Sequence, residues 1–584
     1  MRLSLRIRVL FLLLALVQGA SAQVPAPPKH EVRGVWVTTA ASLDWPKSSN
    51  RLEQQASLRS ILLDLHRANF NTIFFQVRAR GDAYYHSRYE PWAENLTGTL
   101  GKDPGWDPLA FLITEAHTLG IEVHGWFNLF KVRGPNPFPV SSPLHVSRAH
   151  PQWTVQDEGE IWLDPGIPAV RRYLLDVAVD LVGNYALDGI NFDFIRYPGR
   201  TFSDQESYRK FGGGMDRDNW RRSNIDSFVA EFAAAAAMTR PMLKVGSSPL
   251  GVYETDTTSN TLGSYSAVYQ DSEGWLRRNI HDYLSPQLYW DIGTSKGDPD
   301  FARLVRRWQQ GSNERHIYIG IGAYKPEIFR EIPRQIDSSR EAGNQGLSFY
   351  RLEHVRALDM FGGRFGAPAL IPPMAWKDSI PPLPPSHLAV AEVMTNVFNL
   401  EWTPSPEAKD GDTARIYVVY RSSPSAPNID FASNIIAVIP GNVTCYIDTV
   451  RIPTGLTYYY ALTALDKGNN ESAPSTVGTG VVKELLALKG KLSNLATLSV
   501  AFGQGSTTPT LLAYRIPDPR NVTLEILEEK SDGDRSIFAV LVDGQAEEGT
   551  HIIGMGKHHL PPGNYTVRLR AGETIVDHAL NIRP

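Results

Sequence analysis

The sequence of 584 residues contains a single cysteine, Cys445. One thiol excludes an intramolecular disulfide and a cysteine-based zinc site. No stretch beyond the N-terminal region reaches about 18 consecutive apolar residues, the length that a membrane-spanning helix needs. Basic residues are not in excess either, because the net charge is −4 and the pI is about 6.4. We therefore expect no nucleic-acid partner.

The first 22 residues have the pattern of a cleavable secretory signal. Arg2, Arg6 and Arg8 precede an apolar run over 9–17, and the small residues Ala-Ser-Ala follow at 20–22. This pattern predicts cleavage after residue 22 and no membrane span in the mature chain. We expect an exported protein, located in the periplasm, on the cell surface or outside the cell.

Eight strand-like runs alternate with helix-like stretches between residues 31 and 375. The expected strands are 33–39, 71–80, 121–128, 188–194, 243–251, 282–290, 316–324 and 346–352. The expected helices between them are 57–70, 107–120, 170–185, 223–238, 265–280, 301–310 and 331–343. This order predicts an α/β fold with a (β/α)8 TIM-type barrel over 31–375. The interval 129–166 is predicted to be rich in loops and to lie over the active-site face.

A proline-rich linker over 371–386 ends the helical pattern. Beyond it, apolar and polar residues alternate at strand spacing. We expect two all-β sandwich domains, 385–484 and 485–584.

The expected fourth strand contains the strongest candidate for catalysis. In DGINFDF (188–194), Asn191 and Asp193 lie on one alternation, and Asp193 is near the strand's carboxyl end. A carboxylate within an apolar strand is costly unless it is paired or functional. The alternative to a catalytic role is an ion pair of Asp193 with Arg196 or Arg78.

Further polar and aromatic residues follow the other strands. They are Arg78, Asp82, Glu90, His124, Trp126, Asn128, Glu254, Gln287, Tyr289, Trp290 and Asp291. Glycosidases need two carboxylates that flank the scissile bond, and aromatic faces stack on sugar rings. The set therefore indicates a polysaccharide site, although His124 is also typical of a core histidine, and Trp126 and Trp290 of packing at the barrel mouth.

Two other chemistries are disfavoured. His117 and His124 do not share a helix, and no HExxH motif occurs, so no metal is expected. The segment SSPLG (247–251) lacks the G-x-S-x-G turn of a serine hydrolase. A sugar deacetylase or esterase is thus a weaker alternative, and no cofactor is predicted.

The barrel region resembles the bacterial glycosyl-hydrolase-like family ten. The resemblance is based on EVRGVWVTT (31–39), NTIFFQVRARGDAYYHSRYEPWAENLTG (71–98), LDGINFDFIRYP (187–198) and DYLSPQLYW (282–290). It implies a (β/α)8 barrel that acts on glycans. Described members cleave peptidoglycan strands from which the stem peptides have been removed.

The resemblance also implies roles for single residues. Asp193 matches the acidic end of the family's D-G-x-x-F-D motif, Arg78 and Asp82 match Q-V-R-x-x-G-D, and Gln287 and Tyr289 match P-Q-x-Y. Many members have a second Asp at the position of Phe194. The second catalytic carboxylate stays open among Asp82, Glu90, Glu254 and Asp291.

The region 385–484 resembles a fibronectin type III domain, on the basis of Trp402, YVVYR (417–421) and TYYYALTALDKGNNES (457–472). The region 485–584 resembles the C-terminal sorting domains of some secreted bacterial proteins, which would imply contact with a secretion or surface-attachment machinery. A plain accessory sandwich is the alternative.

These observations predict an exported glycoside hydrolase whose partner is a glycan. In the predicted reaction, one carboxylate protonates the glycosidic oxygen while another attacks the anomeric carbon or activates water. The predicted catalytic residues are Asp193, as nucleophile or base, Asp82 and Asp291. The predicted substrate-binding residues are Arg78, His124, Trp126, Asn128, Arg196, Gln287, Tyr289 and Trp290. The alternative is a non-catalytic glycan-binding or adhesion protein on a barrel that has lost its activity.

Overall fold

The computed structural model of the chain describes residues 25–582 with gaps. The gaps are 135–139, 258, 260, 294–296, 356–360, 395–396, 424, 451–456, 482–496, 503–508, 517, 530–534, 547–548, 555–559 and 561–562. The predicted signal segment 1–22 lies outside the described residues. The chain divides into two compact units, Met1–Ser386 with Pro404–Val443 and Tyr460–Val477, and His387–Thr403 with Thr444–Tyr459 and Gly478–Pro584.

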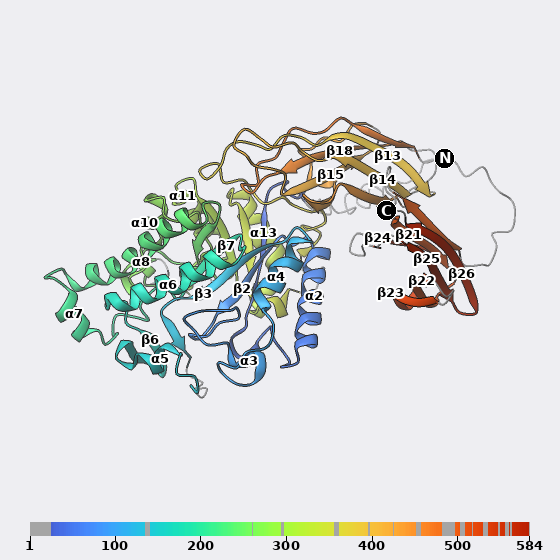
Figure 1. Cartoon of the computed structure of the whole chain (residues 1–584). Coiled ribbons are helices and arrows are strands. Elements are labelled where there is room, and N and C mark those ends of the chain that lie inside the picture. Colours follow the sequence, from blue (N-terminus) through green and yellow to red (C-terminus); the bar gives the residue numbers. More distant parts are fainter. Residues whose placement is uncertain are drawn as a thin grey trace, which may run out of the picture. The chain divides into compact units, whose positions relative to one another are not determined.

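The first unit contains a closed parallel barrel (Figure 1). Its strands are β1 (Val32–Val37), β2 (Thr72–Arg78), β3 (Glu122–Asn128), β7 (Gly189–Asp193), β8 (Lys244–Ser247), β9 (Tyr283–Leu284), β10 (Gln287–Leu288), β11 (His316–Ile321) and β12 (Gly346–Phe349). β9 and β10 are two parts of the predicted sixth strand, and both pair with β11. β12 pairs with β1, which completes the circle. The predicted (β/α)8 barrel is therefore confirmed.

Helices connect the strands at the predicted places. The main ones are α2 (Arg51–Arg67), α4 (Pro108–His117), α6 (Pro168–Asn184), α8 (Arg217–Thr239), α10 (Ser272–Arg277), α11 (Phe301–Gln310) and α13 (Ile332–Glu341). Shorter ones are α3 (Glu94–Thr97), α5 (Val146–Ala149), α7 (Gln205–Phe211), α9 (Ser264–Ala267) and α12 (Pro326–Phe329). Asp107 caps α4, because its side chain accepts the N–H of Ala110 at 2.9 Å.

The alternation of β7 decides which side chains face the barrel interior. Phe192 packs outward against Phe228 and Phe232 of α8, with ring centroids 5.3 and 4.8 Å away. Asn191 points inward, and its side-chain amide donates to the Tyr283 hydroxyl at 3.4 Å. Asp193, two residues further on, shares the face of Asn191 and ends the strand at the barrel mouth.

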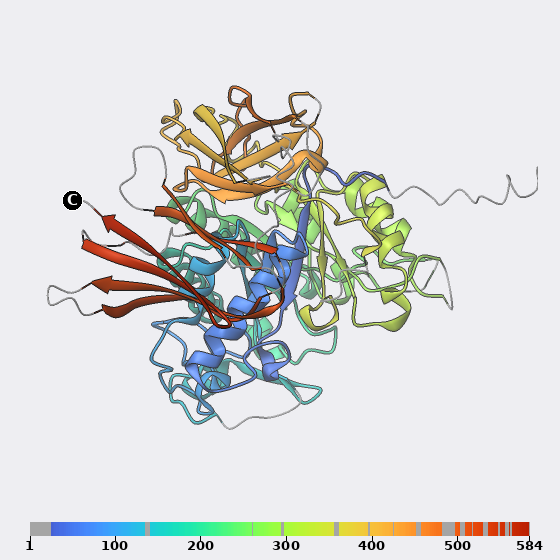
Figure 2. The same ribbon diagram turned by 90° about the vertical axis from the view of Figure 1, so that its right-hand side faces the viewer.

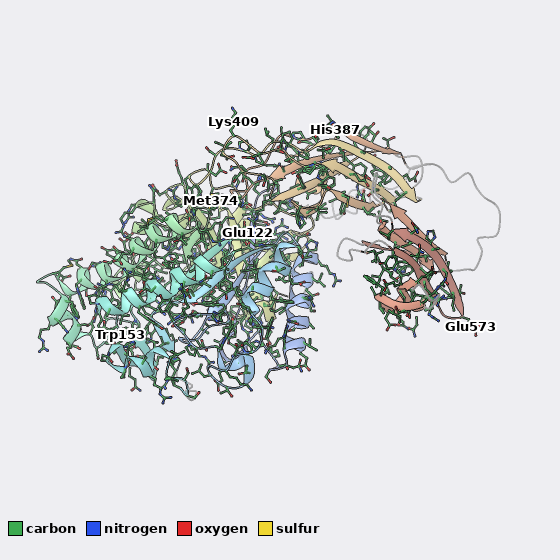
Figure 3. All side chains as sticks on the ribbon, viewed as in Figure 1. Glu122, Trp153, Met374, His387, Lys409 and Glu573 are labelled. Carbon is green, nitrogen blue, oxygen red and sulfur yellow. The ribbon has the colours of Figure 1, made fainter. Side chains whose placement is uncertain are left out.

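The interval 129–166 differs from the prediction. It contains a small antiparallel sheet in the order β4-β6-β5, made of β4 (Lys131–Arg133), β5 (Thr154–Asp157) and β6 (Glu160–Leu163). The strands have three or four residues each, too few for periodicity to reveal. Figure 3 shows Trp153, in this interval, and Glu122, the first residue of β3, at opposite ends of the barrel.

A network of buried charges occupies the amino end of β3. Glu122 lies 2.6 Å from Lys244 and 3.3 Å from Arg415, and Arg415 also pairs with Asp188. His117 lies 2.8 Å from the other oxygen of Asp188. Burial alone would raise the pKa values of Glu122 and Asp188, but these cations hold both below their usual range. Arg415, far along the chain, thus belongs to the same compact unit as the barrel.

The described residues from Ser386 onward form mainly antiparallel β-strands, as predicted. The strands are β13 (Ser386–Met394), β14 (Val397–Thr403), β15 (Ile416–Ser422), β16 (Ile435–Pro440), β17 (Cys445–Thr449), β18 (Thr457–Leu465), β19 (Gly478–Val481), β20 (Thr497–Phe502), β21 (Pro509–Ile516), β22 (Arg520–Glu529), β23 (Arg535–Ala546), β24 (Gly549–Gly554), β25 (Gly563–Ala571) and β26 (Thr574–Ile582). Antiparallel sheets have the orders β13-β14-β17, β20-β21-β24 and β23-β22-β25-β26 (Figure 2). None of the described helices is long and apolar enough to cross a membrane.

Candidate active site

A cavity of about 420 Å³ opens at the carboxyl ends of the barrel strands. This is the face on which barrel enzymes hold their reactive groups. The described residues that line it are Trp36, Thr38, Ala40, Ala41, Leu43, Gln76, Ala79, Arg80, Trp126, Asn128, Lys131, Arg133, Gly134, Asp193, Phe194, Arg196, Ser248, Gln287, Tyr289 and Tyr350.

Asp193 is the only carboxylate among these described lining residues. Its Oδ1 accepts the N–H of Phe194 at 2.8 Å and the side-chain amide of Gln287 at 3.4 Å. Burial raises the pKa of Asp193, although the Phe194 N–H and the charges of Arg196 and Lys131 oppose the shift. A carboxyl with a raised pKa retains its proton at higher pH, which suits a general acid.

Four aromatic rings form one wall of the cavity. The rings of Trp36 and Trp126 meet edge to face at 5.2 Å, and Trp126 meets Tyr350 in the same way at 6.2 Å. Tyr289 stacks on Tyr350 at 5.9 Å. Such surfaces bind the apolar faces of sugar rings.

Two buried polar atoms of β3 lack a hydrogen-bond partner among the described residues. They are the indole nitrogen of Trp126 and the amide oxygen of Asn128. Trp126 is 4% exposed and Asn128 is 5% exposed. The Asn128 amide nitrogen donates to the Ala79 carbonyl at 2.9 Å, which identifies the unpartnered atom as an acceptor. Being two residues apart, the two side chains lie on the same face of the strand. They offer one donor and one acceptor beside the cavity.

The structure brings six of the predicted site residues together in this cavity: Asp193, Trp126, Asn128, Arg196, Gln287 and Tyr289. In the described part of the chain, Asp193 has no ion pair within 4.0 Å, so the alternative of a structural pair with Arg196 or Arg78 is not observed.

Two predicted substrate-binding residues lie elsewhere. Arg78 is fully buried, and its guanidinium forms an ion pair with Glu90 at 2.7 Å. His124 is 1% exposed inside the barrel, where it contacts the Tyr283 hydroxyl at 2.9 Å and Glu122 at 3.3 Å. Neither is among the lining residues of the cavity.

The candidates for a second carboxylate also lie away from the cavity lining. Asp82 is fully buried; it accepts the N–H of Arg80 at 2.8 Å and lies 3.6 Å from its guanidinium, so it orients that lining residue. Glu90 is paired with Arg78, and the exposed Glu254 lies 3.5 Å from Arg307.

The remaining two predicted residues follow β10. Asp291 is half-buried, and its carbonyl accepts the N–H of Phe301 at 3.1 Å. Trp290 is half-buried with its ring against Gly251. Neither is among the lining residues.

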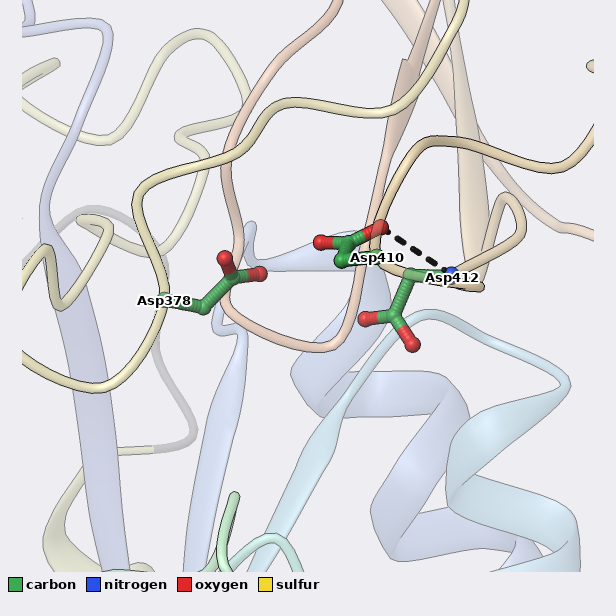
Figure 4. Close-up of side chains that lie close together, drawn as sticks. All are labelled: Asp378, Asp410 and Asp412. Atoms are coloured by element: carbon green, nitrogen blue, oxygen red, sulfur yellow. Dashed lines mark hydrogen bonds between the residues drawn. The ribbon is translucent and has the colours of Figure 1, made fainter.

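A cluster of acidic residues lies outside this cavity. Carboxylate oxygens of Asp378, Asp410 and Asp412 lie within 4.8 Å of one another (Figure 4). Asp410 also accepts the N–H of Asp412 at 3.1 Å. Exposed acidic groups often gather in this way without an ion. We assign no metal site to this cluster.

The glycosyl hydrolase-like 10 family model matches residues 31–335, more than half of this sequence. The chain belongs to this family. Glycosyl hydrolase YngK of Bacillus subtilis (strain 168) is 30% identical over 484 residues, which cover 77% of this chain and 93% of that protein. Glycosyl hydrolase DigH of Escherichia coli (strain K12) is 34% identical over 340 residues, 52% of this chain and 77% of that protein. This glycosyl hydrolase-like 10 protein is a glycoside hydrolase.

All three family motifs contribute to the cavity lining. D-G-x-x-F-D supplies Asp193, P-Q-x-Y supplies Gln287 and Tyr289, and Q-V-R-x-x-G-D supplies Gln76 and Arg80. Asp82, the last residue of Q-V-R-x-x-G-D, accepts the Arg80 N–H at 2.8 Å. Phe194 lines the cavity with a φ of +49°, a conformation that Asp and Asn adopt more readily than a bulky residue.

Several lining residues of this glycosyl hydrolase-like 10 protein were not predicted. They are Trp36, Gln76, Lys131, Arg133, Ser248 and Tyr350, among others. Trp36, Ser248 and Tyr350 lie at or just after strand ends, so a systematic reading of all eight strand ends could have found them. Lys131 and Arg133 lie on β4, which the sequence did not reveal.

Proposed function

We propose that this protein hydrolyses the glycan of bacterial cell walls, namely peptidoglycan strands without stem peptides, and that Asp193 is its acid catalyst. The observation that carries the proposal is the position of Asp193: a carboxyl with a raised pKa, alone among cations and amides, beside an aromatic wall. In the reaction Asp193 would protonate the glycosidic oxygen as the bond to the anomeric carbon breaks.

The absence of a second carboxylate from the described lining residues favours a substrate-assisted reaction. Residues 135–139, Pro-Asn-Pro-Phe-Pro, which follow the lining residue Gly134 in the sequence, contain no acidic residue. Both sugars of peptidoglycan carry a 2-acetamido group. Its carbonyl oxygen would attack the anomeric carbon and form a cyclic oxazolinium, which water then opens while returning a proton to Asp193.

Trp126 and Asn128 support this assignment. An acetamido group has one acceptor, its carbonyl, and one donor, its N–H. The unpartnered Trp126 N–H and Asn128 amide oxygen match these two groups. Leaving such buried groups unsatisfied costs about 1–3 kcal/mol each, so a ligand that satisfies them gains affinity.

The test uses the full chain without residues 1–22. We expect it to cleave peptide-stripped peptidoglycan in preference to intact peptidoglycan and neutral polysaccharides, with the anomeric configuration retained in the first product seen by NMR. Asp193→Asn should lower kcat/KM about 10²–10⁴-fold. Asp176→Asn, on the surface of α6, is the matched control.

Inversion at the anomeric carbon would overturn the substrate-assisted step and leave the substrate assignment intact. Full turnover by Asp193→Asn would remove Asp193 from the mechanism. Binding of stripped glycan without any cleavage would favour the non-catalytic alternative, and release of acetate would favour a deacetylase.

The location and the accessory modules belong to the same proposal. We propose that residues 1–22 direct export to the periplasm, the cell surface or the medium, where this glycan occurs. Residues 385–484 would form a fibronectin type III module, and 485–584 a surface-delivery module. Detection of the mature chain outside the cytoplasm, and its loss when residues 1–22 are deleted, would support export.

A further inference from the structure

The cavity is basic although the whole chain is acidic. The chain has a net charge of −4, yet four basic residues and one carboxylate are among the described lining residues. Two of the four have acidic partners: Lys131 pairs with Glu160, and Arg80 lies 3.6 Å from Asp82 and 3.8 Å from Glu94. The surplus of positive charge therefore rests on the other two, Arg133 and Arg196.

Neither of these arginines forms an ion pair within 4.0 Å in the described part of the chain. Arg196 donates one hydrogen bond, to the Tyr197 carbonyl at 3.2 Å. For Arg133 the described residues supply no hydrogen-bond partner, and its Nε is buried. Arg133 and Arg196 are both only partly exposed. A guanidinium in such a place is costly unless an anion compensates it, and a concave site concentrates its field on ligands.

The contacts place this charge on one wall. The Lys131 ammonium lies 4.7 Å from the centre of the Phe194 ring, and the Arg196 guanidinium lies 5.4 Å from the same centre. Arg133 follows Lys131 by two residues on β4, and both residues line the cavity. β4 and the end of β7 thus present cations around the Phe194 ring, beside Asp193.

We propose that Arg133 and Arg196 bind a carboxylate carried by the substrate sugar. Arginine suits this task because its planar fork donates two parallel hydrogen bonds to a carboxylate. The inference rests on the proposed function and makes its substrate more specific. In stripped peptidoglycan the carboxylate is that of the lactyl group of muramic acid; a uronic acid is the other source of the same chemistry.

The proposal gives a physical reason for a preference for stripped glycan. When a stem peptide is attached, the lactyl carboxyl is an amide, which is neutral and cannot pair with a guanidinium. Removal of the peptide restores the negative charge. Arg133 and Arg196 would therefore distinguish the two glycans by charge as well as by size.

The experiment compares four ligands: stripped peptidoglycan glycan, the same glycan with its lactyl carboxyls converted to primary amides, a chitin oligosaccharide and a polyuronate. Turnover is measured with the wild type, and binding by calorimetry with Asp193→Asn. We expect kcat/KM and affinity to be about tenfold or more higher for the carboxylate form than for the amide form.

Arg133→Gln, in either background, should reduce this ratio to near one, mainly through KM and Kd. Arg133→Lys should keep part of it, because the charge remains but the fork is lost. Arg209→Gln, an exposed position on α7, is the control that should leave the ratio unchanged.

Equal affinity of the protein for the carboxylate and amide forms of the glycan would overturn the proposal. The same holds if Arg133→Gln weakens the binding of both forms by the same factor. A carboxylate preference in binding without turnover of any glycan would uphold it and refute the proposed function instead. Arg133-dependent binding of the polyuronate alone would uphold the carboxylate site and identify a uronic acid as its source.

Discussion

At the scale of single residues, the chemistry depends on the protonation of one carboxyl. Asp193 has a pKa raised by burial, and the nearby guanidinium of Arg196 limits the rise. A general acid works only while it is protonated, so activity should fall as pH rises through the pKa of Asp193.

Arg196→Gln should move this fall in activity to higher pH. The guanidinium stabilises the Asp193 carboxylate; without it the acid form persists to higher pH, so the pKa of Asp193 rises further. The measurement is kcat/KM against pH on stripped glycan for wild type, Arg196→Gln and the surface control Arg209→Gln. If the fall of kcat/KM in Arg196→Gln occurs at the same pH as in the wild type or at a lower pH, this account is contradicted.

Residue types and strand alternation predicted many of the residues that line the cavity, but not which polar side chains pair with one another inside the barrel. Alternation in DGINFDF was enough to place Asp193 at the mouth, and the aromatic and amide residues of β3 followed in the same way. Arg78 and His124 lie outside the cavity lining for a common reason. Each carries a polar group that suits sugar binding, but in the folded chain this group already has partners. Arg78 pairs with Glu90, and His124 contacts the Tyr283 hydroxyl and Glu122.

At the scale of secondary structure, the eight barrel strands were predictable because buried parallel strands appear in the sequence as nearly continuous apolar runs. The sheet β4-β6-β5 was not, because its three- and four-residue strands carry too little pattern. This missed element supplies Lys131 and Arg133, so the charge of the cavity was missed with it.

Arg415, just before β15, should be a strong contributor to stability. Arg415→Met leaves the buried Glu122 and Asp188 with fewer cations, and we expect a loss of about 3 kcal/mol or more in the free energy of unfolding at pH 7. Denaturant unfolding measures it, with the exposed Arg306→Met as the control, expected to stay within about 0.5 kcal/mol.

The same pair predicts how this loss depends on pH. Carboxyls whose folded pKa values are depressed stabilise the fold above their unfolded pKa, and this stability is lost as pH falls. The difference between wild type and Arg415→Met should therefore shrink below about pH 4. A difference that stays constant down to pH 3 would contradict the charge network.

At the scale of the whole molecule, the compact unit of the barrel extends beyond the proline-rich linker. Segments Pro404–Val443 and Tyr460–Val477 belong to it, and Asn469 as well as Arg415 reaches Glu122. The linker predicted a boundary near residue 375, because a proline-rich segment signals a break in the chain but says nothing about later contacts.

A chain that ends at residue 375 should therefore be less stable than one that ends at 484, by about 5 °C or more in Tm. The longer chain should retain kcat/KM on soluble stripped glycan within about twofold of the full chain, since every described cavity residue lies between Trp36 and Tyr350. Thermal unfolding and turnover of the three chains check both expectations. Equal Tm values for the two truncated chains would show that Arg415 adds nothing to the barrel.

The small sheet that holds β4 does not share hydrogen bonds with the barrel strand that holds Asp193. Of the two arginines proposed to bind the carboxylate, Arg133 therefore belongs to a different sheet from the acid, whereas Arg196 follows Asp193 by three residues. Substitution of Arg133 alone would change which sugars a relative accepts and leave its proton donor and the adjacent Lys131 in place, so engineers seeking new polysaccharide specificities can begin at that position.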